Sequence, residues 1–395
     1  MHQKRHQEKK DGRKGNALRI AMIGHKRIPS REGGIEVVVE EISRRLVTEG
    51  HEVFAYNRKA PAVHETRLED REVAAAGNRK EYQGIHLITI PTLYKSKYNA
   101  LIYSILGSVR ALRGRYDAIH YHAEGPCAML WLPHMFGIRT VATIHGLDWQ
   151  RSKWKGFAVR YLKFGEKIAA KYADEIIVLS RNIQNYFMDT YQRAVHYIPN
   201  GIEKPVLRDA RVISQKWGLK KRNYLLFLAR IVPEKGLHYL IDTFKELETS
   251  MKLVIAGGSS HTDRYLQEVV SGAASDPRIL FTGFIQGEEL EELYSNTYLY
   301  ILPSDLEGMP VSLLEAMSYG NCCLVSDIPE CAEVVEDRAV TFRRGDLSDL
   351  KEKLQFLIDQ PEAVNQYRER ASDYICGKYN WDNIVKDTLA LYGEP

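Results

Sequence analysis

The chain has 395 residues, of which 44% are hydrophobic, and this length predicts two hydrophobic cores of ordinary domain size. Its formal charge of +4 arises in the first fourteen residues, which hold six Lys or Arg and two Asp or Glu, so the remainder has 49 of each sign. The folded part thus lacks the basic excess typical of nucleic-acid binding, and its apolar runs are shorter than the roughly 18 residues of a membrane-spanning helix.

The N-terminal segment, residues 1–16, has no apolar side chain after Met1 in its first fourteen residues. It offers nothing to a core and lacks the apolar centre of a signal peptide, so we expect a disordered basic tail. The five cysteines are an odd number without CxxC spacing, which is typical of a reducing compartment. These observations predict a cytoplasmic protein.

Strand-like and helix-like segments alternate over residues 17–201, the first predicted domain. An apolar strand at 18–24, a helix at 34–48 and a strand at 52–56 predict a βαβ unit. Further strands are expected at residues 85–90, 118–121, 140–144, 175–179 and 195–198. The alternation indicates a mostly parallel sheet with helices on both faces.

The same pattern restarts after a polar linker region at residues 202–222. Strands are expected at residues 224–228, 252–256, 279–281, 298–302 and 323–325. They predict a second domain over 223–378, followed by a terminal helix within 379–395 that could pack on either domain. The expected fold class is α/β, with two doubly wound, Rossmann-like parallel sheets. Ligands bind beyond the carboxyl ends of the strands in such sheets, so two facing domains predict a central cleft.

The glycines of two strand-to-helix loops do not match cofactor motifs. The first loop ends in Gly33-Gly34 and lacks the GxGxxG spacing of a dinucleotide site. Two glycines before a helix allow backbone amides to approach an anion, although a flexible turn would look the same. The loop after residue 256 contains no GK[ST], which disfavours a kinase or an ATPase.

Charged residues follow two strands of the second domain. Arg230 and Lys235 flank a turn after one strand, where they could bind a diphosphate or remain solvated. Glu307 and Glu315 are eight residues apart after another strand, and Pro310 can begin the helix that carries Glu315. Both carboxylates could face the cleft, or they could only complement the helix dipole.

These motifs together resemble the retaining glycosyltransferases of family 4, which have the two-domain GT-B architecture. The resemblance is carried by Arg230 and Lys235, by Glu-x7-Glu in PSDLEGMPVSLLEAMSYG, by TIHGLDW at 143–149, and by IPNG at 198–201. With Gly33-Gly34 they occur in the family's order and extend over nearly the whole chain from about residue 18. The first domain would then be the acceptor side, and the second would bind a nucleotide-sugar.

The resemblance implies a role for each matching residue. Arg230 and Lys235 would neutralise the leaving diphosphate, Glu315 would accept hydrogen bonds from ribose, and Glu307 would bind a donor-sugar hydroxyl. Donor oxygens would also meet the backbone amides of Gly33, Gly34, Gly308, Met309 and Val311. His145 would lie beside the donor sugar, although a lone histidine is often structural. The family often has EGFGL where this chain has EGMPV, and Pro310 has no N–H to donate.

No metal and no cofactor beyond the sugar nucleotide are expected. His120 and His122 share one strand face, but no third ligand is evident in the sequence, and no Asp-x-Asp motif occurs at the predicted site. Retention of configuration could use a carboxylate nucleophile. We favour instead a route in which the leaving phosphate oxygen takes the acceptor proton on the same face.

The predicted function is transfer of a hexosyl group from a nucleotide-diphosphate sugar, by resemblance a UDP-sugar, to a saccharide or lipid-linked saccharide in bacterial surface-polysaccharide synthesis. Basic and aromatic residues mix at 94–115 and 149–171, which suits either peripheral contact with an anionic membrane or a solvated surface. Alternatives are an epimerase or hydrolase of the same fold, and a non-catalytic sugar-nucleotide-binding protein. Four charged residues retained together, Arg230, Lys235, Glu307 and Glu315, favour transfer.

Overall fold

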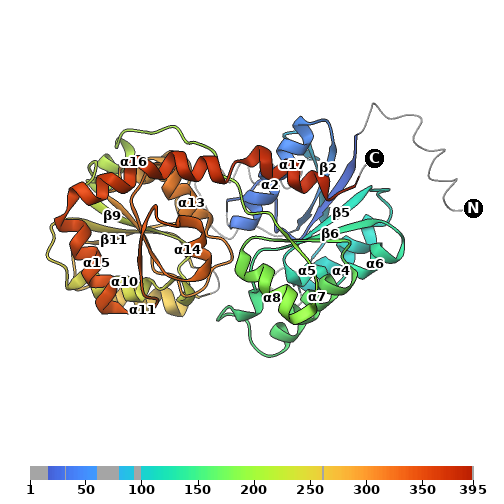
Figure 1. Ribbon diagram of the computed structural model, residues 1–395, viewed down its shortest axis with the longest axis horizontal. Helices are drawn as coiled ribbons and strands as arrows, with labels where there is room; N and C mark the ends of the chain where they lie inside the picture. Colours follow the sequence, from blue (N-terminus) through green and yellow to red (C-terminus); the bar gives the residue numbers. More distant parts are fainter. Residues whose placement is uncertain (1–16, 32, 60–79, 93–98, 260–261, 394–395) are drawn as a thin grey trace, which may run out of the picture.

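The computed structural model describes residues 17–31, 33–59, 80–92, 99–259 and 262–393, so the predicted disordered tail lies outside the described residues. Within these ranges the chain forms two α/β domains that lie side by side (Figure 1). Each domain is built on a parallel sheet, which confirms the predicted fold class. The predicted strands are all present, with ends that agree within two residues.

The first domain contains an eight-stranded sheet with the order β3-β4-β2-β1-β5-β6-β7-β8. Its strands are β1 (Arg19–Ile23), β2 (Glu52–Arg58), β3 (Glu81–Tyr82), β4 (Ile85–Ile90), β5 (Ala118–His122), β6 (Arg139–Ile144), β7 (Glu175–Val178) and β8 (His196–Tyr197). All neighbours are parallel except β3 and β4. The central strand β5 is buried along its whole length, because helices cover both faces of the sheet.

Helices cover the two faces of the first sheet unequally. On one face lies α2 (Gly34–Thr48), whose Val38, Ile42 and Leu46 recur at helical spacing and enter the core. The other face is covered by α4 (Asn99–Ala111), α5 (Glu124–Cys127), α6 (Trp131–Met135), α7 (Phe157–Tyr172) and α8 (Arg181–Tyr191), and η1 (Asp148–Gln150) precedes α7 (Figure 1). This helical layer forms one outer side of the molecule.

The second domain contains a six-stranded parallel sheet with the order β11-β10-β9-β12-β13-β14. Its strands are β9 (Tyr224–Leu228), β10 (Lys252–Ala256), β11 (Ile279–Gly283), β12 (Leu299–Leu302), β13 (Cys323–Ser326) and β14 (Val340–Phe342). Its helices are α9 (Val212–Trp217), η2 (Pro233–Lys235), α10 (Leu237–Lys245), α11 (Asp263–Ala273), α12 (Gly287–Asn296), α13 (Val311–Ser318), α14 (Pro329–Val335), α15 (Leu347–Asp359) and α16 (Pro361–Lys378). The sheet separates two hydrophobic clusters, one on each face.

The segment expected as a linker, residues 202–222, is not a simple connection. It contains α9, and Ile213 is fully buried in the core of the second domain. The backbone N–H groups of Arg211 and Ile213 each donate to the buried Glu292 carboxylate at 3.0 Å. The latter part of this segment therefore belongs to the second domain. Although the surrounding sequence is polar, the apolar side chain of Ile213 packs into the core of that domain.

The chain returns to the first domain at its C-terminal end. Helix α16 leads from the second domain into α17 (Trp381–Ala390), which packs on α2 (Figure 1). Trp381, Ile384 and Val385 are buried with the apolar residues of α2, and the Arg45 guanidinium stacks over the Trp381 ring at 5.0 Å. The two domains are thus joined by two crossings of the chain. No helix in the described part of the chain is long and apolar enough to span a membrane.

Candidate active site

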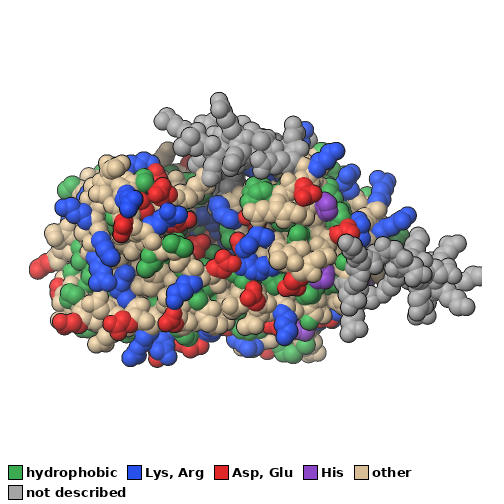
Figure 2. Space-filling view, turned by 90° about the horizontal axis from the view of Figure 1, so that it is seen from above, with side chains coloured by type: hydrophobic (Ala, Val, Ile, Leu, Met, Phe, Trp, Pro, Cys, Tyr) green, Lys and Arg blue, Asp and Glu red, His purple; other side chains and the backbone are tan. Residues whose placement is uncertain are grey.

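The loops at the carboxyl ends of the two sheets meet between the domains. The Cα of Gly308 lies so close to the His145 carbonyl oxygen that a Cβ there would be 1.7 Å from it. The Asn200 N–H donates to Met309 Sδ at 3.0 Å, and a Cβ on Gly34 would lie 3.3 Å from Val311. The surface is hollowed between the two domains, with Lys and Arg side chains around the hollow (Figure 2). The residues predicted from distant parts of the sequence are therefore brought to one interdomain cleft.

An ion pair between Lys235 and Glu307 lies in the second-domain wall of this cleft. The two side chains are only 12% and 7% exposed, and the Ser304 hydroxyl donates to the same Glu307 oxygen at 2.7 Å. A close approach of the backbone makes the pair possible: Gly236 has φ of 66°, and a Cβ there would be 1.9 Å from the Pro303 carbonyl oxygen. Glycine at this position lets the η2 turn rest directly on the loop after β12.

Cations from both domains surround this pair. Arg230 follows β9, and burial followed by the charge of Arg151 lowers the pKa of its guanidinium. Arg151 and Lys153 come from the loop between β6 and α7, where Arg151 also pairs with Asp148 at 2.8 Å. Lys153 is exposed at the rim of the cleft, and partial desolvation there, followed by the charges of Arg230 and Arg151, lowers the pKa of its ammonium to about 8. Cations held this close together repel one another, so binding of an anion with more than one negative charge between them is favoured.

Arg151 and Lys153 are functional candidates that the sequence did not single out for the cleft. In the sequence they lie in the basic and aromatic segment at 149–171, which suggested a surface role. The available signal was their position directly after the TIHGLDW motif. Only the facing of the two sheets places them opposite Arg230.

Glu315 occupies the second turn of α13, farther along the second-domain wall. The Tyr294 hydroxyl donates to Glu315 Oε2 at 2.9 Å, and the Tyr294 ring stacks on Tyr319 with centroids 5.2 Å apart. Burial raises the pKa of the Glu315 carboxyl, an effect that the hydrogen bond from Tyr294 opposes. Its Oε1 accepts no hydrogen bond within the described residues and is free to accept one from a ligand.

His145 directly follows β6 on the first-domain wall. Its Nε2 lies 3.1 Å from His122 Nδ1, and burial lowers the pKa of the His145 imidazole to about 4. The rings of His120 and His122 are tilted by 30° with their centroids 4.1 Å apart, and His120 Nδ1 lies 2.7 Å from the Tyr392 hydroxyl. His120 and His122 thus join a row of imidazoles, and no group of three metal-ligand residues is found within residues 17–393 as far as they are described.

Gly33 and Gly34 stand at the start of α2, as expected. Gly33 is the N-cap with extended backbone, and the Glu36 carboxylate lies over it, 2.6 Å from a Cβ built on Gly33. Glu36 also accepts a hydrogen bond from the Lys26 N–H at 3.0 Å. A phosphate bound at this helix start would lie close to the Glu36 carboxylate, which has the same sign of charge. Anion binding by Gly33 and Gly34 therefore stays a prediction.

A buried carboxylate holds the loop that carries Arg151 and Lys153. Glu166 accepts hydrogen bonds from the Trp149 indole at 2.9 Å and from the hydroxyls of Tyr186 at 2.8 Å and Tyr191 at 2.5 Å. Beside it lies Glu124, whose carboxyl pKa is raised to about 10 by burial and then by neighbouring carboxylates. No motif in the sequence indicates this network, because its members come from four separate segments.

Two doubly wound domains that close a cationic cleft between their strand ends define an enzyme of the GT-B class. The family model described as Glycosyltransferase Family 4 matches residues 32–204, and the model described as Glycosyl transferases group 1 matches residues 209–374. The chain belongs to this glycosyltransferase family, as the sequence motifs predicted, and it is a transferase.

Similar proteins support the family and the fold. A glycosyltransferase of Methanocaldococcus jannaschii is 24% identical over 371 residues, which cover 92% of this chain and 95% of that protein. The O-antigen chain mannosyltransferase of Salmonella typhimurium is 25% identical over 57% of this chain and 61% of its own. Sucrose-phosphate synthase from Thermosynechococcus elongatus superposes with a TM-score of 0.79 at 18% identity, covering 95% and 98% of the chains. An Anabaena protein solved with UDP-glucose gives 0.75 at 16% identity, covering 94% and 99%.

Proposed function

We propose that this glycosyltransferase moves a hexosyl group from a UDP-sugar to a hydroxyl of a saccharide or lipid-linked saccharide during polysaccharide synthesis. The observation that carries the proposal is the set of cations from both domains around the Lys235–Glu307 pair. A structure of the same fold contains UDP-glucose, and a relative is an O-antigen mannosyltransferase, which supports the uridine nucleotide and the polysaccharide acceptor.

The cations act on the leaving group. The donor diphosphate lies among Arg230, Lys235, Arg151 and Lys153, and Lys235 is shared between the diphosphate and Glu307. A charge pair 4 Å apart at an effective dielectric constant near 20 is worth roughly 4 kcal/mol before desolvation. Part of this energy acts only on charge that grows on the diphosphate as the glycosidic bond breaks, so the cations accelerate the chemical step.

The remaining residues hold the donor and direct the acceptor. Glu307 accepts a hydrogen bond from a hydroxyl of the transferred sugar, and Glu315 Oε1 accepts hydrogen bonds from the ribose. The imidazole of His145, neutral at pH 7, lies beside the sugar. The donor also meets the backbone N–H groups at the start of α2 and on either side of Pro310, contributed by Gly33, Gly34, Gly308, Met309 and Val311.

The reaction retains the configuration at the sugar carbon. The bond between that carbon and the phosphate oxygen breaks, the acceptor oxygen bonds to the carbon on the same face, and the acceptor proton passes to the departing phosphate oxygen. Fixed cations neutralise the diphosphate, so turnover is proposed to require no divalent metal. An epimerase or hydrolase of the same fold would use the cleft without a second sugar.

The test is a panel of UDP-, GDP-, ADP- and dTDP-sugars incubated with the purified protein, with slow release of the nucleotide diphosphate as the readout. We expect release from a UDP-sugar, equal release after exhaustive chelation, and faster release when a suitable saccharide is added. Lys221→Ala, an exposed residue of the second domain, serves as the matched control. Binding without release would favour a non-catalytic protein, an altered free sugar nucleotide would favour an epimerase, and neither binding nor release would refute the proposal.

A further inference from the structure

We propose that a row of buried residues behind the cleft fixes His145 as the tautomer with its proton on Nδ1, so that His145 donates a hydrogen bond to an oxygen of the donor sugar. The row consists of His122, His120, Thr143 and Tyr392, and we call it the imidazole row. Its four members act through His145 and are positioning residues. The inference rests on the proposed function for one point, that the donor sugar lies beside His145.

One hydrogen bond joins the imidazole row to His145. His122 Nδ1 and His145 Nε2 lie 3.1 Å apart. Both rings are neutral at pH 7, because burial lowers the pKa of His145 to about 4 and the pKa of His122 well below its usual value. A neutral imidazole has one nitrogen that donates and one that accepts. Either His122 or His145 therefore supplies the proton in this contact.

The other nitrogen of His122 selects between these two arrangements. His122 Nε2 is buried and has no hydrogen-bond partner among the described residues. A proton on Nε2 would create a buried N–H group without an acceptor, whereas a bare nitrogen leaves only a lone pair unused. Buried N–H groups without a partner are the rarer of the two in folded proteins. The proton of His122 therefore lies on Nδ1 and is donated to His145 Nε2.

This arrangement determines the state of His145. Because its Nε2 accepts a hydrogen bond, the proton of the neutral ring lies on Nδ1. No described residue accepts a hydrogen bond from this Nδ1, and the His145 carbonyl oxygen is in close contact with Gly308 across the cleft. The Nδ1–H group is thus a donor for a ligand between the domains. The hydroxyl and ring oxygens of a sugar are acceptors of the kind that it requires.

His120 is held at both ring nitrogens. Its Nδ1 lies 2.7 Å from the Tyr392 hydroxyl, and its Nε2 lies 2.7 Å from the Thr143 hydroxyl. Burial raises the pKa of Tyr392 and lowers the pKa of His120 to about 3, so the phenol keeps its proton and the imidazole is neutral. The phenol is the more acidic of the two hydroxyls, so Tyr392 donates to Nδ1 and Nε2–H donates to Thr143. Two hydrogen bonds at opposite sides fix the plane of the ring.

The fixed ring of His120 supports His122. The two residues alternate along β5, so their side chains lie on the same face of the sheet. Their ring centroids are 4.1 Å apart, which is contact distance. Since His122 is hydrogen-bonded at one nitrogen only, its orientation depends on the groups packed against it. Contact with a ring that cannot turn keeps Nδ1 of His122 directed at His145.

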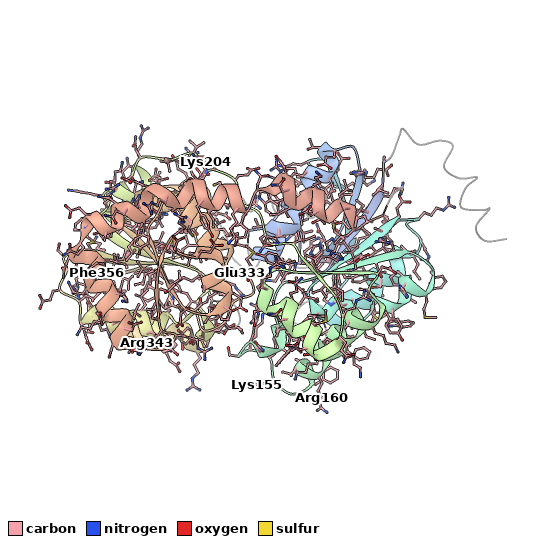
Figure 3. The ribbon with its side chains drawn as sticks, viewed as in Figure 1. Lys155, Arg160, Lys204, Glu333, Arg343 and Phe356 are labelled. Atoms are coloured by element: carbon pink, nitrogen blue, oxygen red, sulfur yellow. The ribbon has the colours of Figure 1, made fainter. Side chains whose placement is uncertain are left out.

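Tyr392 reaches the imidazole row from the C-terminal end of the chain. It follows α17, which lies on the side of the first domain opposite Lys155 and Arg160 (Figure 3). The preceding residue is anchored, because the Arg139 side chain donates to the Leu391 carbonyl oxygen at 2.6 Å. The Tyr392 side chain is buried, so bulk water does not compete for its hydroxyl. The return of the chain to the first domain therefore supplies a contact on which an active-site residue depends.

The alternative is that the imidazole row only fills the core between α17 and the first sheet. Apolar residues would fill that space without the desolvation penalty of buried polar groups. Instead, Tyr392, Thr143 and His120 pair with one another, and the contacts continue through His122 to a residue in the cleft wall. A chain of buried polar contacts that ends at the cleft indicates a functional role.

The first experiment needs no donor and so tests the imidazole row separately from the proposed function. The full chain, labelled with 15N in histidine, is compared by NMR with Tyr392→Phe, Thr143→Val and Thr143→Ser, and signals are assigned by replacing single histidines. We expect the proton of His145 on Nδ1. Tyr392→Phe and Thr143→Val should shift the ring signals of His145, whereas Thr143→Ser keeps the hydroxyl and should restore them. A proton on His145 Nε2, or His145 signals that neither variant changes, would overturn the proposal.

The second experiment measures turnover with the active donor. Tyr392→Phe keeps the aromatic ring and loses one buried hydrogen bond, so the turnover number should fall about fivefold. The affinity for free UDP should stay constant, because UDP lacks the sugar. Adding Tyr392→Phe to His122→Phe should cause no further loss, since the link to His145 is already broken.

Tyr298→Phe is the matched control in the second domain. The Tyr298 hydroxyl donates to the Leu357 carbonyl oxygen at 2.8 Å, and its side chain is buried, as that of Tyr392 is. The control should lower the thermal midpoint as Tyr392→Phe does and leave turnover unchanged. Equal losses of turnover in the two variants, or an additive loss in Tyr392→Phe with His122→Phe, would overturn the proposal. Absence of nucleotide release from every donor would refute the proposed function, and the NMR signals of His145 would still decide its tautomer.

Discussion

Replacing Lys235 by alanine should damage both catalysis and stability, for separate reasons. The ammonium neutralises the leaving diphosphate in the proposed reaction, so its loss should lower the turnover number by about 10²–10³, or roughly 3–4 kcal/mol. It also leaves Glu307, with a side chain only 7% exposed, without its cation. Breaking a buried pair in this way typically costs about 3 kcal/mol or more, which lowers the thermal midpoint by roughly 6–12 °C.

Two further variants separate these effects. Lys235→Ala combined with Glu307→Gln removes the unpaired charge, so most of the lost stability should return while turnover stays low. Arg230 forms no ion pair with the described residues and is crowded by Arg151, so Arg230→Ala should lower turnover by a similar factor with little change in stability. Lys216, in the exposed pair with Glu289, is the matched control, and its replacement should cost under about 1 kcal/mol.

The measurements are thermal unfolding and the rate of nucleotide diphosphate release from the active donor. Near-normal turnover in both Lys235→Ala and Arg230→Ala would refute the assignment of these cations to the leaving group. Restored turnover in Lys235→Ala with Glu307→Gln would show that Lys235 only neutralises the Glu307 carboxylate, and it would also contradict the proposed role of Glu307 in turnover. An unchanged thermal midpoint in Lys235→Ala would contradict the burial of the pair.

Three other predictions concern the same cleft. Glu315→Gln should weaken the calorimetric affinity for free UDP, whereas Glu307→Gln should leave it unchanged and lower turnover, because UDP contains the ribose but not the sugar; the opposite pattern would exchange their roles. Affinity for UDP should fall as pH rises from below to above about 8, because Lys153, with a pKa near 8, loses its charge over that range. Lys153→Arg should remove this pH dependence. If the dependence persists in that variant, a group other than Lys153 causes it. His122→Phe should lower turnover about tenfold by leaving His145 Nε2 without its partner at 3.1 Å, while UDP affinity stays constant; equal losses in both would indicate a general structural defect.

Local sequence determined most of the elements and the family. Strands buried on both faces must be continuous apolar runs, so β9 (Tyr224–Leu228) and β10 (Lys252–Ala256) could be predicted to the residue. The short strands β3 and β14 were not predicted, because two or three residues are too few to show the alternation of apolar and polar side chains that indicates a strand. Helix α9 was hidden in a polar stretch for a related reason, since its burial depends on a distant partner, Glu292.

The sequence predicted some residues of the candidate site, but not how they contact one another. Arg230, Lys235, Glu307 and Glu315 stand in motifs with fixed spacing, and the order of residues along the chain is enough to recognise them. Their pairing is tertiary: Gly236 must lie against Pro303 for Lys235 to reach Glu307. The order of residues along the chain did not indicate that Lys235 would pair with the Glu307 carboxylate.

Tertiary structure alone decided how the two domains cooperate. Arg151 and Lys153 became cleft residues because the carboxyl ends of the two sheets face each other. The terminal helix α17 could have packed on either domain, and it lies on α2 because Trp381 and Val385 complete the core there. Local propensity and spacing are properties of neighbouring residues, whereas a charge cluster or a shared core requires residues hundreds of positions apart to meet, and only the packed fold brings them together.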